Sequence, residues 1–219
     1  MGAYVLASAA QYFPKDTVHV AVVDPSVGTK RRSIIVKTKH AIYVGPDNGL
    51  LILAANKQEI QNVYQITDPK YLLPKVSNTF HGRDIFAPVA AHLAAGVDPS
   101  LFGPQITDYV FPTYVEPQTK HGELFGEVLY IDDFGNIISN ISVDLLKKTG
   151  FCEGNSLLIK VGEKRLSLPY YSTYGAVPVG ASLALVGSGD LLEVAVNQGN
   201  AAKLFGANVG DVFCVSETG

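Results

Sequence analysis

The sequence predicts an α/β domain over residues 1–118 and an all-β domain, a small barrel, over residues 119–219. In the first part, apolar β-branched runs typical of buried strands alternate with segments of helical periodicity. The second part consists mostly of short strand-like segments between glycine turns, and closure into a barrel removes the exposed edges of such strands. Between them, residues 97–120 contain four prolines and show no clear period, as expected for a connection.

The elements of the first domain follow from residue type and spacing. Residues 2–10 are mostly small and apolar and predict a helix, whereas the β-branched run at 18–23 predicts a buried strand. Apolar residues recur at helical spacing within 79–96 and predict a helix that ends at Gly96. The other expected elements are two strands within 33–45, a helix that starts near residue 50 with Asp47 or Asn48 as its cap, and a strand at 62–67.

The second domain opens with an alternating segment that a turn at 132–136 interrupts, which predicts a strand, a tight turn and a second strand. A short helix follows, with Ser142 as its cap and Gly150 at its end. The remaining expected strands are at 155–161, 164–169, 181–187, 191–196 and 211–217.

Composition excludes several classes of partner. The net charge is −3 with 17% charged residues, so the basic stripe of a nucleic-acid-binding protein is missing. No run approaches the roughly 18 apolar residues of a membrane span, and no basic segment precedes an apolar core at the N-terminus. We therefore expect a cytoplasmic protein with a small-molecule ligand. Cys152 and Cys214 lack the spacing of a disulfide framework, metal site or redox pair, and we expect both to be reduced.

The stretch 17–32 places a carboxylate where ligands collect in open α/β sheets. Asp24 follows the apolar run at its carboxyl end, and the small residues Ser26 and Gly28 leave room for a backbone to approach a ligand. Arg31 is close enough in sequence to fold back over Asp24. The alternative is an Asp that caps a turn and an Arg that lies on the surface.

His81 lies near the N-terminus of the predicted helix over 79–96, where unpaired N–H groups and the helix dipole favour an anion. It is a candidate acid, base or orienting group; the alternative is a surface histidine near a cap. The sequence has no nucleophile elbow, Walker loop or zinc-protease motif, and its five histidines are scattered without metal-ligand spacing.

Aromatic residues near turns are candidates to flank a planar ring, and they include Phe80, Phe134 and Tyr174. A flat heterocycle is commonly held between aromatic faces with amide groups at its edge, so Phe134, Tyr174 and Asn136 suit an adenine. Core packing is the alternative for both rings. Other polar residues expected at the ends of elements are Asp47, Asn48, Arg83, Asp132, Ser188 and Asn197.

Six segments carry a specific pattern: YFPKDTVHVAVVDPSVGTKRR, YVGPDNGLL, TFHGRDIFAPVAAHLAAG, IDDFGNIISNI, STYGAVPVG and GSGDLLEVAVNQGNAAKLFG. In order and spacing they resemble the S-adenosylmethionine hydroxide adenosyltransferases, hydrolases related to fluorinating and chlorinating enzymes. The resemblance runs from about Tyr4 to Val215. It implies an N-terminal α/β domain, a C-terminal β-barrel and a homotrimer that binds S-adenosylmethionine between domains of neighbouring subunits.

The resemblance also implies roles for individual residues. Asp24, Arg31 and His81 would hold and polarise a water that attacks the ribose C5′, giving adenosine and L-methionine without a metal or redox cofactor. The halogenating relatives differ at the Asp and His positions, so this pattern favours hydrolysis. The implied substrate-binding residues are Phe134 and Tyr174 around the adenine, Asn136 and the backbone near Gln198 at its edge, Asp132 and Ser188 near the methionine, and Phe80, Gly82 and Asn197 beside these groups.

One departure from the family pattern motivates an alternative. Members begin with a further strand and a Thr-Asp-Phe-Gly-like motif whose Asp binds the ribose hydroxyls, and this sequence lacks that motif. The alternative function is therefore a non-catalytic protein that binds adenosine or S-adenosylmethionine. Halogenation is a third hypothesis. It is disfavoured because Asp24 and His81 would occupy the space around a halide and place a carboxylate beside it. A smaller departure is GSGD at 187–190, where relatives often show Ser-Ser-Gly.

Overall fold

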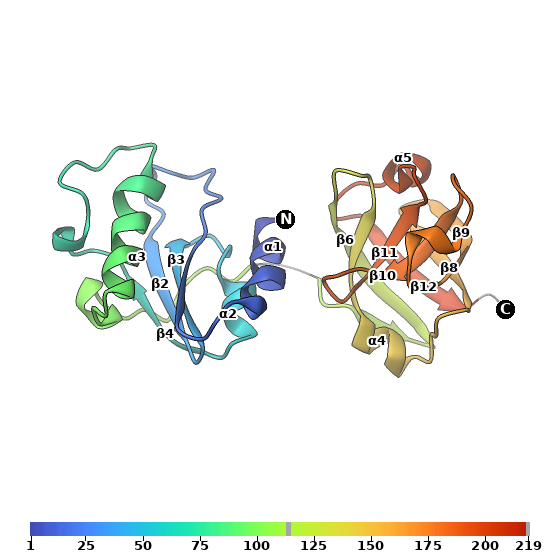
Figure 1. Ribbon diagram of the computed structural model, residues 1–219, viewed down its shortest axis with the longest axis horizontal. Coiled ribbons are helices and arrows are strands. Elements are labelled where there is room, and N and C mark those ends of the chain that lie inside the picture. The colour runs from blue at the N-terminus through green and yellow to red at the C-terminus, as the bar shows by residue number, and fades with distance from the viewer. Residues whose placement is uncertain (113–114, 218–219) are drawn as a thin grey trace. The chain divides into compact units, whose positions relative to one another are not determined.

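The structure is a computed structural model and describes residues 1–112 and 115–217. The chain forms two compact units, Met1–Thr113 and Tyr114–Gly219, and each has its own hydrophobic core. The division falls a few residues before residue 118, where the sequence suggests a boundary. Figure 1 shows the helices and strands of each unit.

The N-terminal unit is built on a four-stranded mixed sheet in the order β1-β3-β2-β4. Its strands are β1 (Thr17–Val20), β2 (Ser33–Thr38), β3 (Ala41–Pro46) and β4 (Ile60–Gln65). β1 is parallel to β3, and β2 is antiparallel to both of its neighbours. Successive side chains of a strand point to opposite faces, so Ile34 and Val36 enter one core cluster and Ile35 enters another. The sheet is therefore buried on both faces.

Helices cover the two faces, as Figure 1 shows for α1 (Gly2–Ala9) and α2 (Ile52–Asn56) on one side and α3 (Ala87–Ala94) on the other. Ala7 and Ala55 share the cluster of Ile34, whereas Val89 and Leu93 share that of Ile35. Short helical turns η1 (Ala10–Tyr12), η2 (Pro69–Tyr71) and η4 (Pro99–Phe102) complete the unit. The predicted α/β class is confirmed.

The strand predicted at 18–23 is shorter and more exposed than expected. β1 ends at Val20, although the N–H of Ala21 still donates to Val44 O. Val22 and Val23 are 44% and 57% exposed. In the described sheet β1 pairs with β3 alone, so its other edge is open and the residues after Val20 leave the sheet. The prediction of a buried strand up to residue 23 is wrong for this reason.

The helix predicted over 79–96 begins with a π-helical turn, η3 (Gly82–Phe86), and continues as α3. Pro88 supplies a physical reason, because it has no N–H to donate to the carbonyl of Asp84. That carbonyl accepts a hydrogen bond from the N–H of Leu73 instead. π-helical turns are frequent at functional sites, and His81 directly precedes this one.

The C-terminal unit is a nearly closed, mainly antiparallel barrel. Its strands follow the order β10-β11-β7-β6-β12-β8-β9, with β5 paired to β6. Tyr170, which follows β9, bridges to Ala184 in β10 and so joins the two ends of this order. The strands are β5 (Gln118–Lys120), β6 (Glu123–Ile131), β7 (Ile137–Ser142), β8 (Ser156–Val161), β9 (Lys164–Pro169), β10 (Ser182–Val186), β11 (Leu191–Val196) and β12 (Val212–Glu217).

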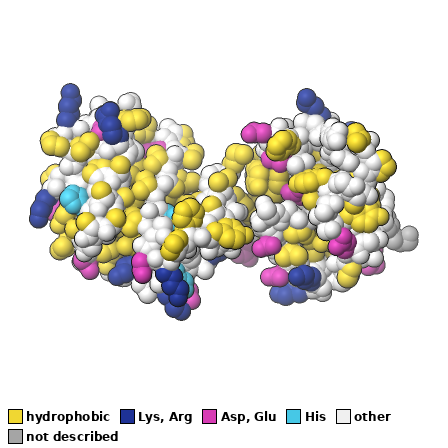
Figure 2. Space-filling view, viewed as in Figure 1, with side chains coloured by type: hydrophobic (Ala, Val, Ile, Leu, Met, Phe, Trp, Pro, Cys, Tyr) yellow, Lys and Arg dark blue, Asp and Glu magenta, His cyan; other side chains and the backbone are white. Residues whose placement is uncertain are grey.

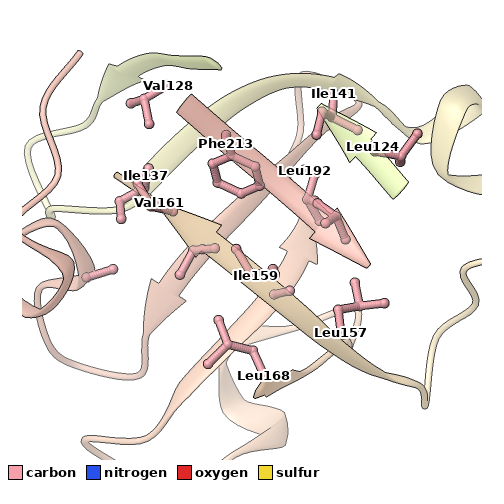
Figure 3. Close-up of a cluster of buried hydrophobic side chains, with 14 of the residues drawn as sticks. Leu124, Val128, Ile137, Ile141, Leu157, Ile159, Val161, Leu168, Leu192 and Phe213 are labelled. Carbon is pink, nitrogen blue, oxygen red and sulfur yellow. The ribbon is translucent and has the colours of Figure 1, made fainter. Parts of the chain in front are cut away.

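Inward-facing aliphatic side chains and Phe213 fill the barrel, and Figure 3 shows Leu192, Ile159 and Val161 around this ring. Two helices and one helical turn lie between strands: α4 (Val143–Lys148), η5 (Tyr174–Ala176) and α5 (Ala201–Phe205). The predicted cap of α4 is confirmed, since the hydroxyl of Ser142 accepts a hydrogen bond from the N–H of Leu145. The predicted barrel is also confirmed.

The surface carries mixed charge. On the face in Figure 2, charged side chains of both signs are scattered over each unit, without an extended patch of one sign. Within residues 1–112 and 115–217, no helix has the length and apolar character that crossing a membrane requires.

Candidate active site

Asp24 and Arg31 form a buried ion pair in the loop that follows β1. The Arg31 guanidinium contacts both carboxylate oxygens, with Nη2 on Oδ2 and Nε donating to Oδ1 at 3.2 Å. The side chains of Asp24 and Arg31 are only 3% and 5% exposed. Ser26 Oγ also donates to Asp24 Oδ1, at 3.1 Å, and Arg31 Nη1 donates to Ser33 Oγ at 2.9 Å. This paired, bonded geometry excludes the alternative of a surface arginine.

His81 joins this pair from a distant part of the chain. Its Nδ1 lies 2.9 Å from Arg31 Nη2. Arginine has only donors, so Nδ1 must accept and the ring proton is assigned to Nε2. The Arg31 guanidinium also lies over the ring of Phe86, 5.4 Å from its centroid. Asp24, Arg31 and His81 therefore form one cluster of an acceptor, a cation and a neutral imidazole, which we call the charged cluster.

A close approach between two loops brings His81 to Arg31. Gly28 has φ +80°, and a Cβ at this position would lie 2.3 Å from the carbonyl oxygen of Asn78. Only glycine fits both the left-handed backbone and this contact. The loop of Asp24 can therefore lie directly against the loop that leads to His81.

Asp84 stabilises the loop that leads to His81. It is buried, binds Arg83 at 2.6 Å, and accepts a hydrogen bond from the N–H of Ser77 at 2.8 Å. These bonds, with Arg83 the larger cause, lower the pKa of Asp84 from its ordinary value. Phe80, which is 56% exposed, lies under the Arg83 guanidinium. Phe80 and Gly82 flank His81 in sequence and so belong to the same region as the charged cluster.

A second group of predicted residues lines a cavity of about 570 Å³ on the barrel, which is within the size range of small-molecule sites. We call it the barrel pocket. Phe134 is 78% exposed and Tyr174 is 42% exposed, so core packing is excluded for both rings. The lining residues are Asp132, Phe134, Asn136, Tyr174, Val196, Gln198 and Gly199.

A compact turn presents Phe134 and Asn136. Asp132 Oδ1 accepts hydrogen bonds from the N–H groups of Phe134 and Asn136, at 3.0 and 2.8 Å. Asp132 Oδ2 accepts from the Asn136 amide at 2.9 Å. Gly135 has φ +86° and its carbonyl accepts from Ala202, which ties the turn to α5. The turn therefore holds an aromatic face and an amide beside each other without the support of a core.

Other lining residues of the barrel pocket come from η5 and the turn after β11. The Tyr174 hydroxyl donates to Glu193 Oε1. Asn197 Nδ2 donates to the carbonyl of Val177 at 2.7 Å, so its side chain fastens the segment of η5 rather than lining the cavity. Gln198 takes a positive φ of 55° between Asn197 and Gly199. Ser188 lies in the turn at 187–190 and is not among the lining residues.

Sequence reasoning did not identify Val196, Gly199 or Glu193. Val196 and Gly199 adjoin predicted residues and carry no chemical signal. Glu193 does carry one, because it is a charged residue within the apolar run of β11. The same reasoning suggested Asp47 or Asn48 as the cap of α2, which has no side-chain cap. Asp47 instead binds Arg32 Nε at 2.8 Å and the N–H of Val110, and Asn48 accepts from the N–H of Leu50 before the helix begins. In the described residues, no group of three or more His, Cys, Asp or Glu side chains is arranged to hold a metal ion.

The fold and these two sites define a two-domain protein with a buried charged cluster on an α/β unit and an aromatic pocket of small-molecule size on a barrel. Models of the SAM hydroxide adenosyltransferase N-terminal and C-terminal domains match residues 1–103 and 126–214. The chain belongs to the SAM hydroxide adenosyltransferase family, which confirms the resemblance seen in the sequence.

Individual relatives agree with this assignment. The (R)-S-adenosyl-L-methionine hydrolase of Thermus thermophilus is 41% identical over 217 residues, which cover 95% of this chain and 79% of the relative. A fluorinase of Actinopolyspora mzabensis is 28% identical over 230 residues, which cover 92% and 77% of the two chains. The crystal structure of a conserved protein from Thermotoga maritima matches with a TM-score of 0.92 and 34% identity, covering 99% of this chain and 83% of that one.

Proposed function

We propose that this chain hydrolyses S-adenosyl-L-methionine to adenosine and L-methionine. The observation that carries the proposal is the charged cluster, in which three residues singled out from the sequence meet within hydrogen-bonding distance. Relatives at about 40% identity that are named (R)-S-adenosyl-L-methionine hydrolase support the same reaction.

The reaction is a displacement at the ribose C5′. A water oxygen forms a bond to C5′ as the C5′–S bond breaks, and the electron pair of that bond stays on sulfur, giving neutral methionine. The water loses one proton, so the products are adenosine, L-methionine and H⁺. Because a sulfonium is already a good leaving group, the protein mainly needs to place the water in line behind C5′.

The charged cluster suits that task. Asp24 provides acceptor oxygens that can orient the water or take its proton, and Arg31 supplies positive charge beside the developing hydroxide. His81 has its Nδ1 occupied by Arg31, which leaves Nε2–H to donate to the water oxygen. No metal or redox cofactor takes part in this scheme.

We assign the adenosine to the barrel pocket. Phe134 and Tyr174 would flank the adenine, with Asn136 and the backbone near Gln198 at its edge. Asp132 and Ser188 would lie toward the methionine, and Phe80, Gly82 and Asn197 would complete the site. The two sets of residues belong to different units, and the family resemblance assigns them to neighbouring subunits of a homotrimer. Light scattering during size-exclusion chromatography tests the trimer.

We also propose a cytoplasmic location, where Cys152 and Cys214, unpaired with each other, would stay reduced.

The decisive experiment is turnover in water labelled with oxygen-18. Purified protein is incubated with S-adenosyl-L-methionine, the products are separated, and their masses are measured by mass spectrometry, with Asp24→Ala as the control. We expect adenosine that carries the label, methionine that does not, and neither product above background in the variant. Unlabelled adenosine, or equal turnover by Asp24→Ala, would exclude the mechanism. A chloride-dependent 5′-halo nucleoside would instead indicate halogenation.

The second candidate function is a non-catalytic protein that binds adenosine or S-adenosylmethionine. The barrel pocket, whose lining residues all come from the C-terminal unit, is compatible with it, but relatives at about 40% identity that are named (R)-S-adenosyl-L-methionine hydrolase do not favour it. Calorimetry distinguishes it from the first: tight binding of adenosine without any product from S-adenosyl-L-methionine would support this function.

A further inference from the structure

Glu193 is a buried carboxylate on a mainly apolar face of the sheet. Its cross-strand neighbours are Leu185 on β10 and Ile138 on β7, and Ala195 lies two residues away on the same face of the sheet. Glu193 is 7% exposed, and no lysine or arginine of the described chain forms an ion pair with it. Burial is the main cause that raises its pKa, and the nearby Asp132 adds to the shift. Burying a carboxylate in this way is costly.

Glu193 instead binds the aromatic wall of the barrel pocket. Its Oε1 accepts a hydrogen bond from the hydroxyl of Tyr174. Tyr174 lies in η5, a turn of three residues without a side-chain cap, and 42% of its surface is exposed. Weak local structure and partial exposure leave the ring few other restraints on its orientation. The bond to the sheet therefore fixes this ring.

The same carboxylate lies against the turn at 187–190. A Cβ on Gly187 would approach Glu193 Oε2 to 2.4 Å, so the carboxylate fills the space that a side chain would take there. The pairing of β11 with β7 also shifts register between Leu191 and Glu193. Such irregularities re-aim a side chain, here toward both η5 and the turn that carries Ser188.

We propose that Glu193 is a positioning residue of the nucleoside site, which holds the Tyr174 ring through its hydroxyl and supports the turn that contains Gly187. The inference rests on the proposed function only in that the barrel pocket binds adenosine. It predicts that the hydroxyl of Tyr174 and the carboxylate of Glu193 act as one unit, although the carboxylate lies behind the wall rather than in the pocket.

The test measures the Kd of adenosine by calorimetry for the full chain and five variants. Tyr174→Phe removes only the hydroxyl, Glu193→Leu removes the acceptor, and a double variant combines them. Glu193→Gln keeps an acceptor oxygen, and Glu163→Gln makes the same change at an exposed position as a control. We expect each of the first two changes to weaken binding about 5- to 10-fold, which is the size of one lost hydrogen bond.

The pattern among the variants decides the proposal. The double variant should be no weaker than the weaker single variant, and Glu193→Gln should recover most of the affinity. In turnover, KM should rise while kcat stays within about twofold, because the lost restraint acts on binding. Wild-type affinity in Tyr174→Phe, additive losses in the double variant, or no adenosine binding by the unaltered protein would each overturn it.

The outcomes separate this inference from the proposed function. If adenosine binds but S-adenosyl-L-methionine gives no product, hydrolysis fails while the affinities still test Glu193. If Glu193→Leu does not fold, Tyr174→Phe and Glu193→Gln decide: loss of affinity in the first with retention in the second supports the proposal, and equal losses in both overturn it.

Discussion

The charged cluster and the barrel pocket are built in opposite ways. Asp24 and Arg31 are 3% and 5% exposed and bind each other, Ser26 and His81. Phe134, in contrast, is 78% exposed and is held only through its backbone turn. Reacting groups gain from being fixed before the substrate arrives, whereas a stacking surface must stay open to receive a ring. Chemistry and recognition therefore make different demands on packing in this protein.

Turnover should respond most strongly to substitutions in the charged cluster. Asp24→Ala should lower kcat by about 10²–10⁴-fold, because the group that orients the water is lost. It should leave the Kd of adenosine unchanged, since the barrel pocket contains no part of Asp24. Product assays and calorimetry on the same preparation check both results. Parallel losses of turnover and of adenosine affinity would contradict the separation of roles.

Asp24→Ala also leaves the charge of Arg31 buried without its partner, which costs about 3–5 kcal/mol of stability. A thermal melt must therefore accompany the assay, and turnover should be measured well below the melting temperature of the variant. Recovery of stability without activity in Asp24→Asn would show that the loss of turnover is chemical rather than structural.

Phe134→Ala tests the other side of the comparison. The Phe134 ring is 78% exposed and belongs to no described core cluster. The free energy of unfolding should therefore change by no more than about 0.5 kcal/mol. Adenosine affinity should fall by about 1–3 kcal/mol, which is typical of a lost stacking partner for a base. Calorimetry and denaturant unfolding give the two numbers. A large loss of stability with unchanged affinity would reverse the roles that we assign to the ring.

Gly28→Ala disturbs the charged cluster without changing its charges. A side chain at φ +80° costs about 1–2 kcal/mol, and its Cβ must also push the Asn78 carbonyl away. We expect kcat to fall because His81 moves away from Arg31. Adenosine affinity, measured as before, should not change. Gly154→Ala, at φ +93° with open space around it, controls for backbone strain alone.

The smallest effect is on the pH dependence of stability. Burial raises the pKa of Glu193 in the folded state above its ordinary value of 4.5, so the folded protein binds this proton more tightly than the unfolded chain does. The Glu193 contribution to the free energy of unfolding is therefore fully favourable below about pH 4.5 and declines as pH rises through the folded pKa. Glu193→Gln should remove this decline, as denaturant unfolding at several pH values would show. An unchanged pH dependence would contradict the burial of a titrating carboxylate.

Short-range signals predicted much of this molecule. The Ser142 cap, the barrel strands and the α/β class follow from patterns within a few residues, and the structure confirms them. The prediction of a buried strand up to Val23 was wrong, because sequence composition does not say which strand lies at the edge of a sheet. The prediction of a single α-helix after residue 79 missed the π-helical turn, which depends on Pro88 and on a carbonyl bound by Leu73.

Glu193 shows why contacts between distant segments could not be predicted from the sequence. The alternation of side chains along β11 places Glu193 on the outer face of the sheet, and outer faces are commonly solvated. The sequence alone therefore predicts an exposed Glu193. Its burial depends on the segment around η5, including Val177, which packs against the same face. That segment is separated from β11 in the sequence by β10, and no local pattern predicts its contact with Glu193.

The order of elements, the Ser142 cap and the turns can be predicted from the sequence alone, as can the residue types able to orient a water or stack on a ring. These properties depend on the conformational preferences of a residue and its near neighbours. Which of those residues meet depends on the tertiary structure. His81 reaches Arg31 across 50 positions through the contact of Gly28 with Asn78, and Glu193 reaches Tyr174 across 19. Such contacts depend on the packing of whole elements, because a chain closes loops of this length only when the contacts formed outweigh the lost conformational entropy.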